Sequence, residues 1–393
     1  MRLARKWMAV LLSLFLLVSL GITALAEEAE APELLTETVA ELPAEEPAEE
    51  LVAEPSEEPA EVSSEDTKAA AVSYYKNYVA IGDSCGSGVG LPQYLQLAAE
   101  TGQMWIACEK IEGSYPTLLA EALGVETYSQ YHFPGARTAD IRYLLDPTFR
   151  ADWVLLGQAM YLSNGVVSKE NLDAYRDEVI EAVRNADLIS VDVGINDCWM
   201  PVVAALYDIA GEGRSNGRLL TVPELVARFG SVGALMDNIL SYVRAWVANP
   251  LRWGAYVSKL TSAMFKWVVD YQVNTAAIMD RIYQLNPNAT LIVCGMYNPV
   301  EGWGLVGVDN TIELLMQPYY SMLNLRKKLE VQLYRGKAIY VEMNGVELVS
   351  DHFTIPLFEF ATDGIFGYNP HPTLNGAKTQ LNHILKALHI PTR

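Results

Sequence analysis

The chain has 393 residues, of which 51% are hydrophobic, and its 48 acidic and 28 basic side chains give a formal net charge of −20. An excess of acid this large argues against the basic surface that nucleic-acid binding requires. The length is enough for one large domain with a substantial core.

Residues 1–26 have the pattern of a secretory signal peptide. Three basic residues precede an apolar stretch over residues 7–20, and Ala-Leu-Ala at residues 24–26 is a small-residue cleavage site. The mature chain is therefore expected to begin at Glu27 and to be secreted or to lie at the cell surface, with no membrane span after cleavage. An uncleaved anchor is the alternative, because the apolar stretch is almost long enough to cross a bilayer.

Residues 27–72 are predicted to form an acidic, disordered linker. The part up to Asp66 holds fifteen Glu, one Asp, and several Pro and Ala, but no Lys or Arg. Such a composition cannot bury enough apolar surface to fold. Without these sixteen acidic groups and the three basic ones of the signal segment, residues 67–393 carry a formal net charge of −7. The folded domain, expected over residues 73–393, is thus only mildly acidic.

The first strand of this domain is predicted over Tyr78–Ile81, and Gly82-Asp83-Ser84 follows it directly. Glycines at the end of a strand allow the sharp turn that a connection from strand to helix requires. Ser84 therefore lies in a tight turn at a strand end, where a nucleophile can be exposed.

Further buried strands and helices alternate along the chain. The predicted strands are Thr127–Tyr131, Leu188–Val193, Thr290–Cys294 and Lys337–Val341, and the predicted helices are Tyr115–Leu123, Leu172–Asn185, Thr275–Leu285 and Leu374–Leu388. This alternation indicates a mainly parallel sheet of about five strands with helices on both faces. Ligands of such sheets bind beyond the carboxyl ends of the strands, where Ser84, Gly135 and Asn196 are expected.

Four sequence blocks in this order resemble the SGNH or GDSL hydrolase family. They are Gly82-Asp83-Ser84 with Gly88, then Gly135, then Gly194-x-Asn196-Asp197, and finally His371-Pro372; Met296-Tyr297-Asn298-Pro299 is also similar to bacterial members. The resemblance covers nearly all of the domain. It implies a flavodoxin-like three-layer α/β/α fold and ester hydrolysis by a serine nucleophile, without a cofactor or metal.

The resemblance also assigns roles to residues. Ser84 is the expected nucleophile and His371 the base, since an imidazole suits proton abstraction at neutral pH. The oxyanion would be bound by the backbone N–H groups of Ser84 and Gly135 and by the side-chain amide of Asn196. From the residues alone, Gly135 could equally be a turn glycine and Asn196 a helix cap.

The third member of the triad departs from the family pattern. The family usually places an aspartate three residues before the histidine, where this chain has Tyr368. Asp363, the side chain of Asn369 or a backbone carbonyl could orient the imidazole instead. We favour Asp363, because Asp363-Gly364 suggests a turn that folds back on the histidine.

Two other functional interpretations compete with this one. Gly82-Asp83-Ser84-Cys85-Gly86 also matches the nucleophile elbow of α/β-hydrolases, but several strands precede the elbow in that fold, whereas here only one does. The missing aspartate would suit a catalytically inactive protein that binds carbohydrate or another partner at the cell surface. The substrate expected of the enzyme is an acyl lipid or an acetylated carbohydrate.

A helical insertion is predicted over about residues 199–274, because the connection from the Asn196 block to the next strand is far longer than a crossover needs. Its aromatic residues include Trp199, Trp246, Trp253, Phe265, Trp267 and Tyr271. They are interpreted first as the core of a helical subdomain and second as a lid or wall over Ser84.

The four cysteines, Cys85, Cys108, Cys198 and Cys294, have no metal-ligand spacing. In a secreted chain they could form one or two disulfides. A Cys85–Cys198 bridge is the pairing considered.

Overall fold

A computed structural model divides the chain into two units, Met1–Val72 and Ser73–Arg393. It describes the second unit over residues 75–103, 105–149, 167–197, 250–299, 311–334, 336–349 and 371–391, with a few short segments between them. Side chains are not described for residues 250–266, or for residues 311, 312, 314 and 315. The predicted signal segment and linker lie outside the described residues.

Five strands form the main sheet: β1 (Asn77–Gly82), β2 (Thr127–His132), β3 (Leu188–Asp192), β6 (Thr290–Cys294) and β8 (Ala338–Val341). The helices are α2 (Pro92–Thr101), α3 (Tyr115–Leu123), α4 (Thr138–Leu145), α6 (Lys169–Asn185), α10 (Pro250–Leu285), α11 (Thr311–Leu333) and α13 (Leu374–Ala387). Two small two-stranded sheets join β4 (Arg214–Ser215) to β5 (Arg218–Leu219) and β7 (Gly304–Leu305) to β9 (Thr354–Ile355).

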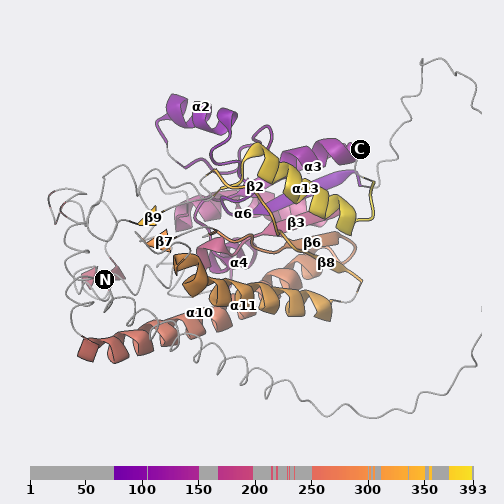
Figure 1. Ribbon diagram of the computed structural model, residues 1–393. Helices are drawn as coiled ribbons and strands as arrows, with labels where there is room; N and C mark the ends of the chain where they lie inside the picture. Colours follow the sequence, from indigo (N-terminus) through magenta and orange to yellow (C-terminus); the bar gives the residue numbers. More distant parts are fainter. Residues whose placement is uncertain are drawn as a thin grey trace, which may run out of the picture. The chain divides into compact units, whose positions relative to one another are not determined.

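The main sheet has the strand order β2-β1-β3-β6-β8, and all of its pairings are parallel (Figure 1). In chain order this is 2-1-3-4-5, the doubly wound order of flavodoxin-like folds. The prediction of a parallel, flavodoxin-like sheet is confirmed. Because β1 lies between β2 and β3, the segments after these three strands meet at one edge of the sheet.

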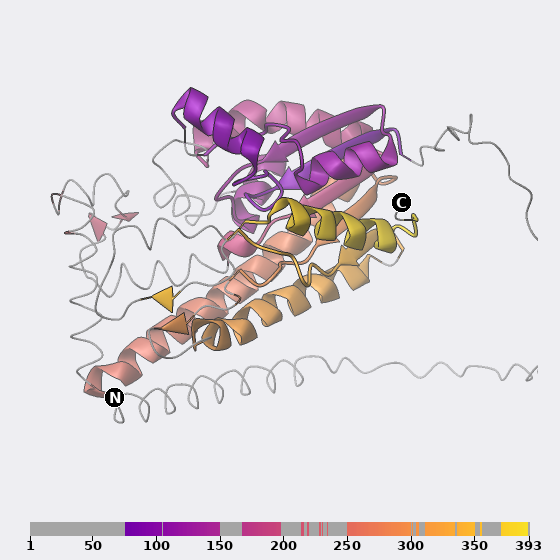
Figure 2. The ribbon, with the colours of Figure 1, turned by 45° about the horizontal axis from the view of Figure 1, so that its top comes forward.

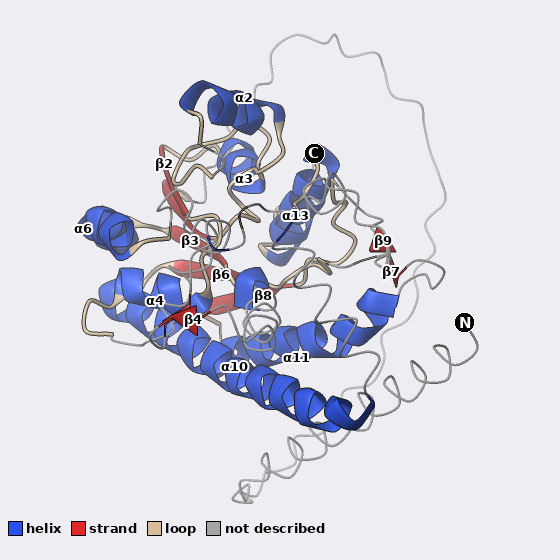
Figure 3. Cartoon of the chain, turned by 90° about the vertical axis from the view of Figure 1, so that its left-hand side faces the viewer, coloured by secondary structure: helices blue, strands red, loops and turns tan. Residues whose placement is uncertain are grey.

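Each face of the sheet packs against its own helices (Figure 3). Val79 and Ile81 of β1 face a core that α4, α6 and α10 complete, whereas Tyr78 and Ala80 face α3 and α13. Successive side chains of a strand point to opposite faces, so a strand buried on both faces is apolar throughout. This explains why the strands could be found in the sequence as continuous apolar runs.

The prediction of a helix over Thr275–Leu285 places its first residue too late. The observed helix, α10, begins at Pro250 (Figure 2). It has 36 residues, and a helix of that length spans about 54 Å. Its first half holds many aromatic and β-branched residues, which have modest helix propensity, but packing against α4 and α11 stabilises the C-terminal part. The predicted insertion boundary near residue 274 therefore falls inside one continuous helix.

Candidate active site

Ser84 lies in a tight turn directly after β1. Its carbonyl oxygen accepts hydrogen bonds from the backbone N–H of Ser87 at 3.3 Å and from the Ser87 hydroxyl at 2.9 Å. Close packing requires a glycine at position 86, because a Cβ at Gly86 would lie 2.2 Å from His132 Nε2. The Ser84 side chain is in a nearly closed environment, with the residue 5% exposed.

The carboxylate of Asp83 joins the Ser84 turn to the segment after β3. Its Oδ1 accepts the Cys85 N–H at 2.9 Å, and its Oδ2 accepts the Gly194 N–H at 3.2 Å. Burial raises the pKa of Asp83 to about 7, and the neighbouring Asp192 carboxylate adds to this effect. Asp83 therefore joins the Ser84 turn to the loop after β3.

Gly135 lies in the loop after β2, with φ of +90°, a conformation that side chains other than glycine rarely adopt. The Phe133 N–H donates to Gly82 O at 3.0 Å, which ties this loop to the end of β1. Beyond it, the buried Arg137 guanidinium makes a two-pronged ion pair with Asp140 at 2.8 Å in the first turn of α4. The Gly135 loop is thus anchored at both ends.

Asn196 lies in the first turn after β3 and bonds to the Gly135 loop. Its Nδ2 donates to Ala136 O at 2.9 Å, and the bond fixes the plane of the amide. The adjacent Asp197 accepts the Thr138 N–H at 2.9 Å and the Thr138 hydroxyl at 2.6 Å. Burial raises the pKa of Asp197 to about 6, and the two bonds from Thr138 oppose this shift. Asp197 is therefore a loop organiser too.

These buried bonds connect three loops through residues that are 59 to 111 positions apart in the chain. Ser84, Gly135 and Asn196 follow three neighbouring parallel strands, so the structure brings the predicted nucleophile and both other predicted oxyanion donors to the same edge of the sheet. Converging N–H groups at such a point can stabilise a negatively charged oxygen.

His371 lies just before α13, beyond the carboxyl end of β8. Its carbonyl oxygen accepts the Val349 N–H at 2.9 Å, beside a β-bridge between Leu348 and Pro372. The Trp105 ring lies beside the imidazole, with ring centroids 6.3 Å apart. Burial lowers the pKa of His371 to about 4, so the ring is neutral, as a general base must be, over most of the pH range.

The predicted partners of this histidine fall outside the described residues. Asp363, Tyr368 and Asn369 belong to that part of the chain, and so does Cys198. Cys85, Cys108 and Cys294 have free thiols, and that of Cys85 accepts a hydrogen bond from the Tyr297 hydroxyl at 3.3 Å.

Sequence reasoning missed a buried polar group beneath the Ser84 turn. His132 Nε2 lies 2.8 Å from Asp192 Oδ1, and both side chains are almost fully buried. The buried Lys327 of α11 lies at the ends of β3 and β6. Nothing in the local sequence marks these residues, because each is paired with a group at least 33 positions away.

Two of the insertion's aromatic residues belong to the main domain. Trp267 and Tyr271 of α10 are buried; the Trp267 ring lies 5.8 Å from the Arg137 guanidinium, and Tyr271 packs against Gly194. For these two, the interpretation as the core of a separate subdomain is wrong. The other aromatic side chains of the predicted insertion are not described.

Within the described residues, no cluster of His, Cys, Asp or Glu side chains has the arrangement of a metal site. Among the helices that the structure describes, none combines the length and the apolar character that a membrane crossing needs.

Comparison with known proteins gives matches among solved structures alone. No protein-family model matches the sequence, and no curated protein does. An extracellular lipase from Streptomyces rimosus is similar over 80% of this chain and 98% of its own, with 20% identity and a TM-score of 0.41. For a phospholipase A1 from Streptomyces albidoflavus the coverage is the same, with 18% identity and a TM-score of 0.39. A carbohydrate esterase family 2 enzyme from Corynascus thermopiles matches over 80% of this chain and 67% of its own, with 14% identity and a TM-score of 0.37. The parallel sheet with flanking helices is the fold that the resemblance to SGNH hydrolases implies.

Proposed function

We propose that this protein is a secreted serine esterase that hydrolyses carboxylic esters through an acyl-enzyme on Ser84. The observation that carries the proposal is the set of buried hydrogen bonds that joins the Ser84, Gly135 and Asn196 loops at one edge of the sheet. A serine at a strand end, a positive-φ glycine and a buried amide side chain at one edge of the sheet are the parts that a nucleophile and its oxyanion donors require.

In the proposed reaction, Ser84 Oγ attacks the ester carbonyl carbon while His371 takes the hydroxyl proton. The negative charge that develops on the carbonyl oxygen is stabilised by the N–H groups of Ser84 and Gly135 and by the Asn196 amide. The C–O bond to the alcohol then breaks, and His371 returns its proton to the leaving alcohol. A water molecule, deprotonated by His371, attacks the acyl-enzyme and releases the acid and Ser84.

The proposed substrates are esters of acyl lipids or acetylated carbohydrates, since both classes present an ester carbonyl to the same nucleophile and oxyanion site. Secretion follows from the proposed signal segment, and the acidic linker would allow the domain to stay near the cell surface. The part of α10 around Trp267 is proposed as a wall of the site, because that ring lies 5.8 Å from the Arg137 guanidinium at the end of the Gly135 loop.

The test is hydrolysis of acyl esters of graded chain length and of an acetylated polysaccharide by the purified full chain. Ser84→Ala should abolish turnover, while Ser114→Ala, a matched loss of a buried hydroxyl that binds Ile111 O at 2.8 Å, should retain most of it. Folded protein that hydrolyses none of these esters would contradict the proposal and favour an inactive binding protein.

The orienting group of His371 needs its own variant. If Asp363 holds the imidazole, Asp363→Asn should lower kcat by about 10⁴-fold, as loss of the orienting carboxylate does in serine proteases. A rate close to that of the unaltered protein would remove Asp363 from the triad.

A further inference from the structure

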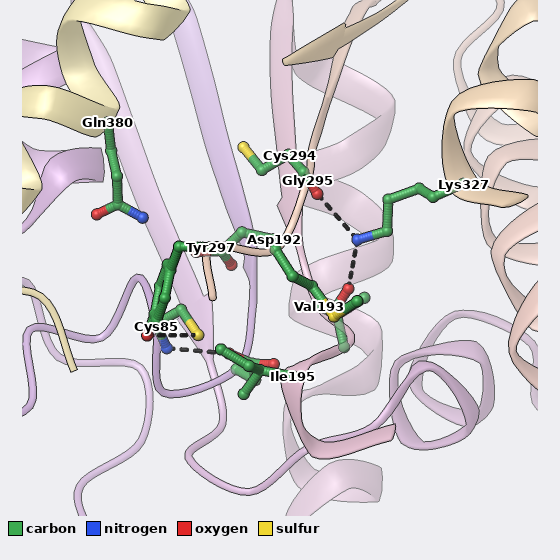
Figure 4. Close-up of a pocket in the computed structure, with 11 residues that line it drawn as sticks. Cys85, Asp192, Val193, Ile195, Cys294, Gly295, Tyr297, Lys327 and Gln380 are labelled. Carbon is green, nitrogen blue, oxygen red and sulfur yellow. Dashed lines mark hydrogen bonds between the residues drawn. The ribbon is translucent and has the colours of Figure 1, made fainter. Parts of the chain in front are cut away.

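Lys327 is a lysine in a place where lysines are rarely found. The residue is 1% exposed, and its Nζ donates to Val193 O at 2.6 Å and to Cys294 O at 2.9 Å (Figure 4). Lysine is almost never fully buried unless its charge is compensated, because desolvation of an ammonium is costly. Burial accordingly lowers the pKa of Lys327. A residue kept at such a cost invites a functional explanation.

The two carbonyl groups lie where β3 and β6 end. Cys294 is the last residue of β6, and Val193 follows β3 directly, three residues before Asn196. Lys327 thus reaches from α11 to the point where the Asn196 turn begins.

One peptide group is held from both sides. The C=O of Val193 and the N–H of Gly194 belong to the same peptide unit; the first binds the Lys327 ammonium and the second binds the Asp83 carboxylate. The other oxygen of that carboxylate binds the N–H of Cys85, the residue next to Ser84. A continuous buried chain of bonds therefore runs from Lys327 through this peptide and Asp83 to the Ser84 turn.

One buried ammonium and two buried carboxylates lie around these hydrogen bonds. Asp83 and Asp192 are buried carboxylates, and they line the same small cavity as Lys327 and Gln380. The cavity volume is about 10 Å³, about the room for one water molecule. Asp192 Oδ2 and Gln380 Oε1 have no hydrogen-bond partner among the described residues. The ammonium is the described cation that faces these carboxylates.

We propose that Lys327 is a positioning residue for the oxyanion site: its ammonium fixes the Val193–Gly194 peptide and, through Asp83, the distance between Asn196 and Ser84. This rests on the proposed function, because the oxyanion site belongs to it. Lys327 touches no substrate, and its effect is on the placement of donors that act in the transition state.

The decisive comparison is between two neighbouring lysines of α11. Lys327→Met removes the buried ammonium, while Lys328→Met removes an exposed one that pairs with Glu342. We expect Lys327→Met to lower kcat by at least about tenfold with KM changed less than about twofold, because displaced oxyanion donors weaken transition-state binding selectively. Lys328→Met should change neither constant.

A third variant separates hydrogen bonding from charge. Lys327→Gln replaces the ammonium with an uncharged amide that has two N–H donors and lies one bond closer to the backbone. It should recover part of kcat, and it also serves if the methionine variant does not fold. In both Lys327 variants the fall of kcat on the acid side of its pH profile should move to higher pH. The reason is that the ammonium favours the ionised form of Asp83, so its removal raises the pKa of that carboxyl. The other titratable groups around Lys327 and Asp83 are the same in all variants; they are Cys85, His132, Asp192, Asp197, Tyr271, Cys294 and Tyr297.

A merely structural role predicts another pattern, in which Lys327→Met lowers the melting temperature but leaves kcat and the acid side of its pH profile unchanged. That result would overturn the inference. If the unaltered chain hydrolyses no ester, the proposed function is refuted, but the positioning role of Lys327 can still be tested by hydrogen exchange. The backbone amides of Cys85 and Gly194 should exchange faster in Lys327→Met than in Lys328→Met. Equal exchange rates would refute the positioning role of Lys327.

Discussion

Replacing Asn196 with alanine tests the oxyanion site through the side chain that the structure fixes best. The amide is held by its bond to Ala136 O at 2.9 Å, and the residue is 5% exposed. Loss of one preorganised donor costs about 3 kcal/mol of transition-state stabilisation, so kcat should fall by about 10²- to 10³-fold with KM nearly unchanged. The same substitution leaves the buried Ala136 carbonyl without this bond, which should cost about 1–3 kcal/mol of stability.

A matched control keeps the two effects apart. Asn286 is also buried, and its amide donates to Val183 O at 2.9 Å and Ala186 O at 2.7 Å, at the opposite end of the strands. Asn286→Ala should lose similar stability in denaturant unfolding but keep its kcat for ester hydrolysis. A kcat for Asn196→Ala within about threefold of the unaltered protein, or an equal kcat loss in both variants, would refute the assignment.

Gly82→Ala should destabilise the fold by about 1–3 kcal/mol, because the added Cβ would lie 1.6 Å from Asp192 Oδ1 and displace that carboxylate; an unchanged melting temperature would contradict the packing described. Asp83 has a folded pKa of about 7 against 3.8 unfolded, so the native state binds the extra proton and the stability from this group falls as pH rises from about 4 to 7. Unfolding of Asp83→Asn at several pH values should lack this decline, which amounts to about 4 kcal/mol. The stability that His371 contributes changes with pH in the opposite direction. Its folded pKa of about 4 lies below 6.5, so the unfolded state binds the extra proton. Relative to His371→Ala, the protein should gain about 3 kcal/mol between pH 4 and 6.5, and a flat difference would show that the ring is not desolvated.

The sheet could be predicted from the sequence because its central strands are buried on both faces. Leu188–Asp192 and Thr290–Cys294 are continuous apolar runs with few polar interruptions, and such runs followed by glycine are distinctive. The positions of Ser84, Gly135 and Asn196 after successive strands followed from the same pattern. Their convergence then depends only on the strand order.

The helices were harder to predict from the sequence, because local residue patterns do not show the packing contacts that stabilise them. Helix α11 holds Pro318 in its interior, which normally ends a helix, and α4 begins directly after a glycine-centred loop. Both escaped the sequence interpretation. Their apolar faces are stabilised by α10, a contact that no local window contains.

The buried polar group around Asp83 was the part of the site least open to prediction. A lysine within an amphipathic helix is normally exposed, so Lys327 carries no sign of its burial next to the strand ends. His132 and Asp192 are 60 positions apart and meet because β2 and β3 flank β1. Such pairs arise from topology, which no local pattern encodes.

Covalent labelling of Ser84 tests the central claim most directly. A fluorophosphonate should modify the folded protein once, with the added mass on the peptide that contains Ser84. Labelling should disappear in Ser84→Ala and persist in Ser114→Ala. Absence of labelling in folded protein, or labelling that survives Ser84→Ala, would contradict the assignment of Ser84 as the nucleophile.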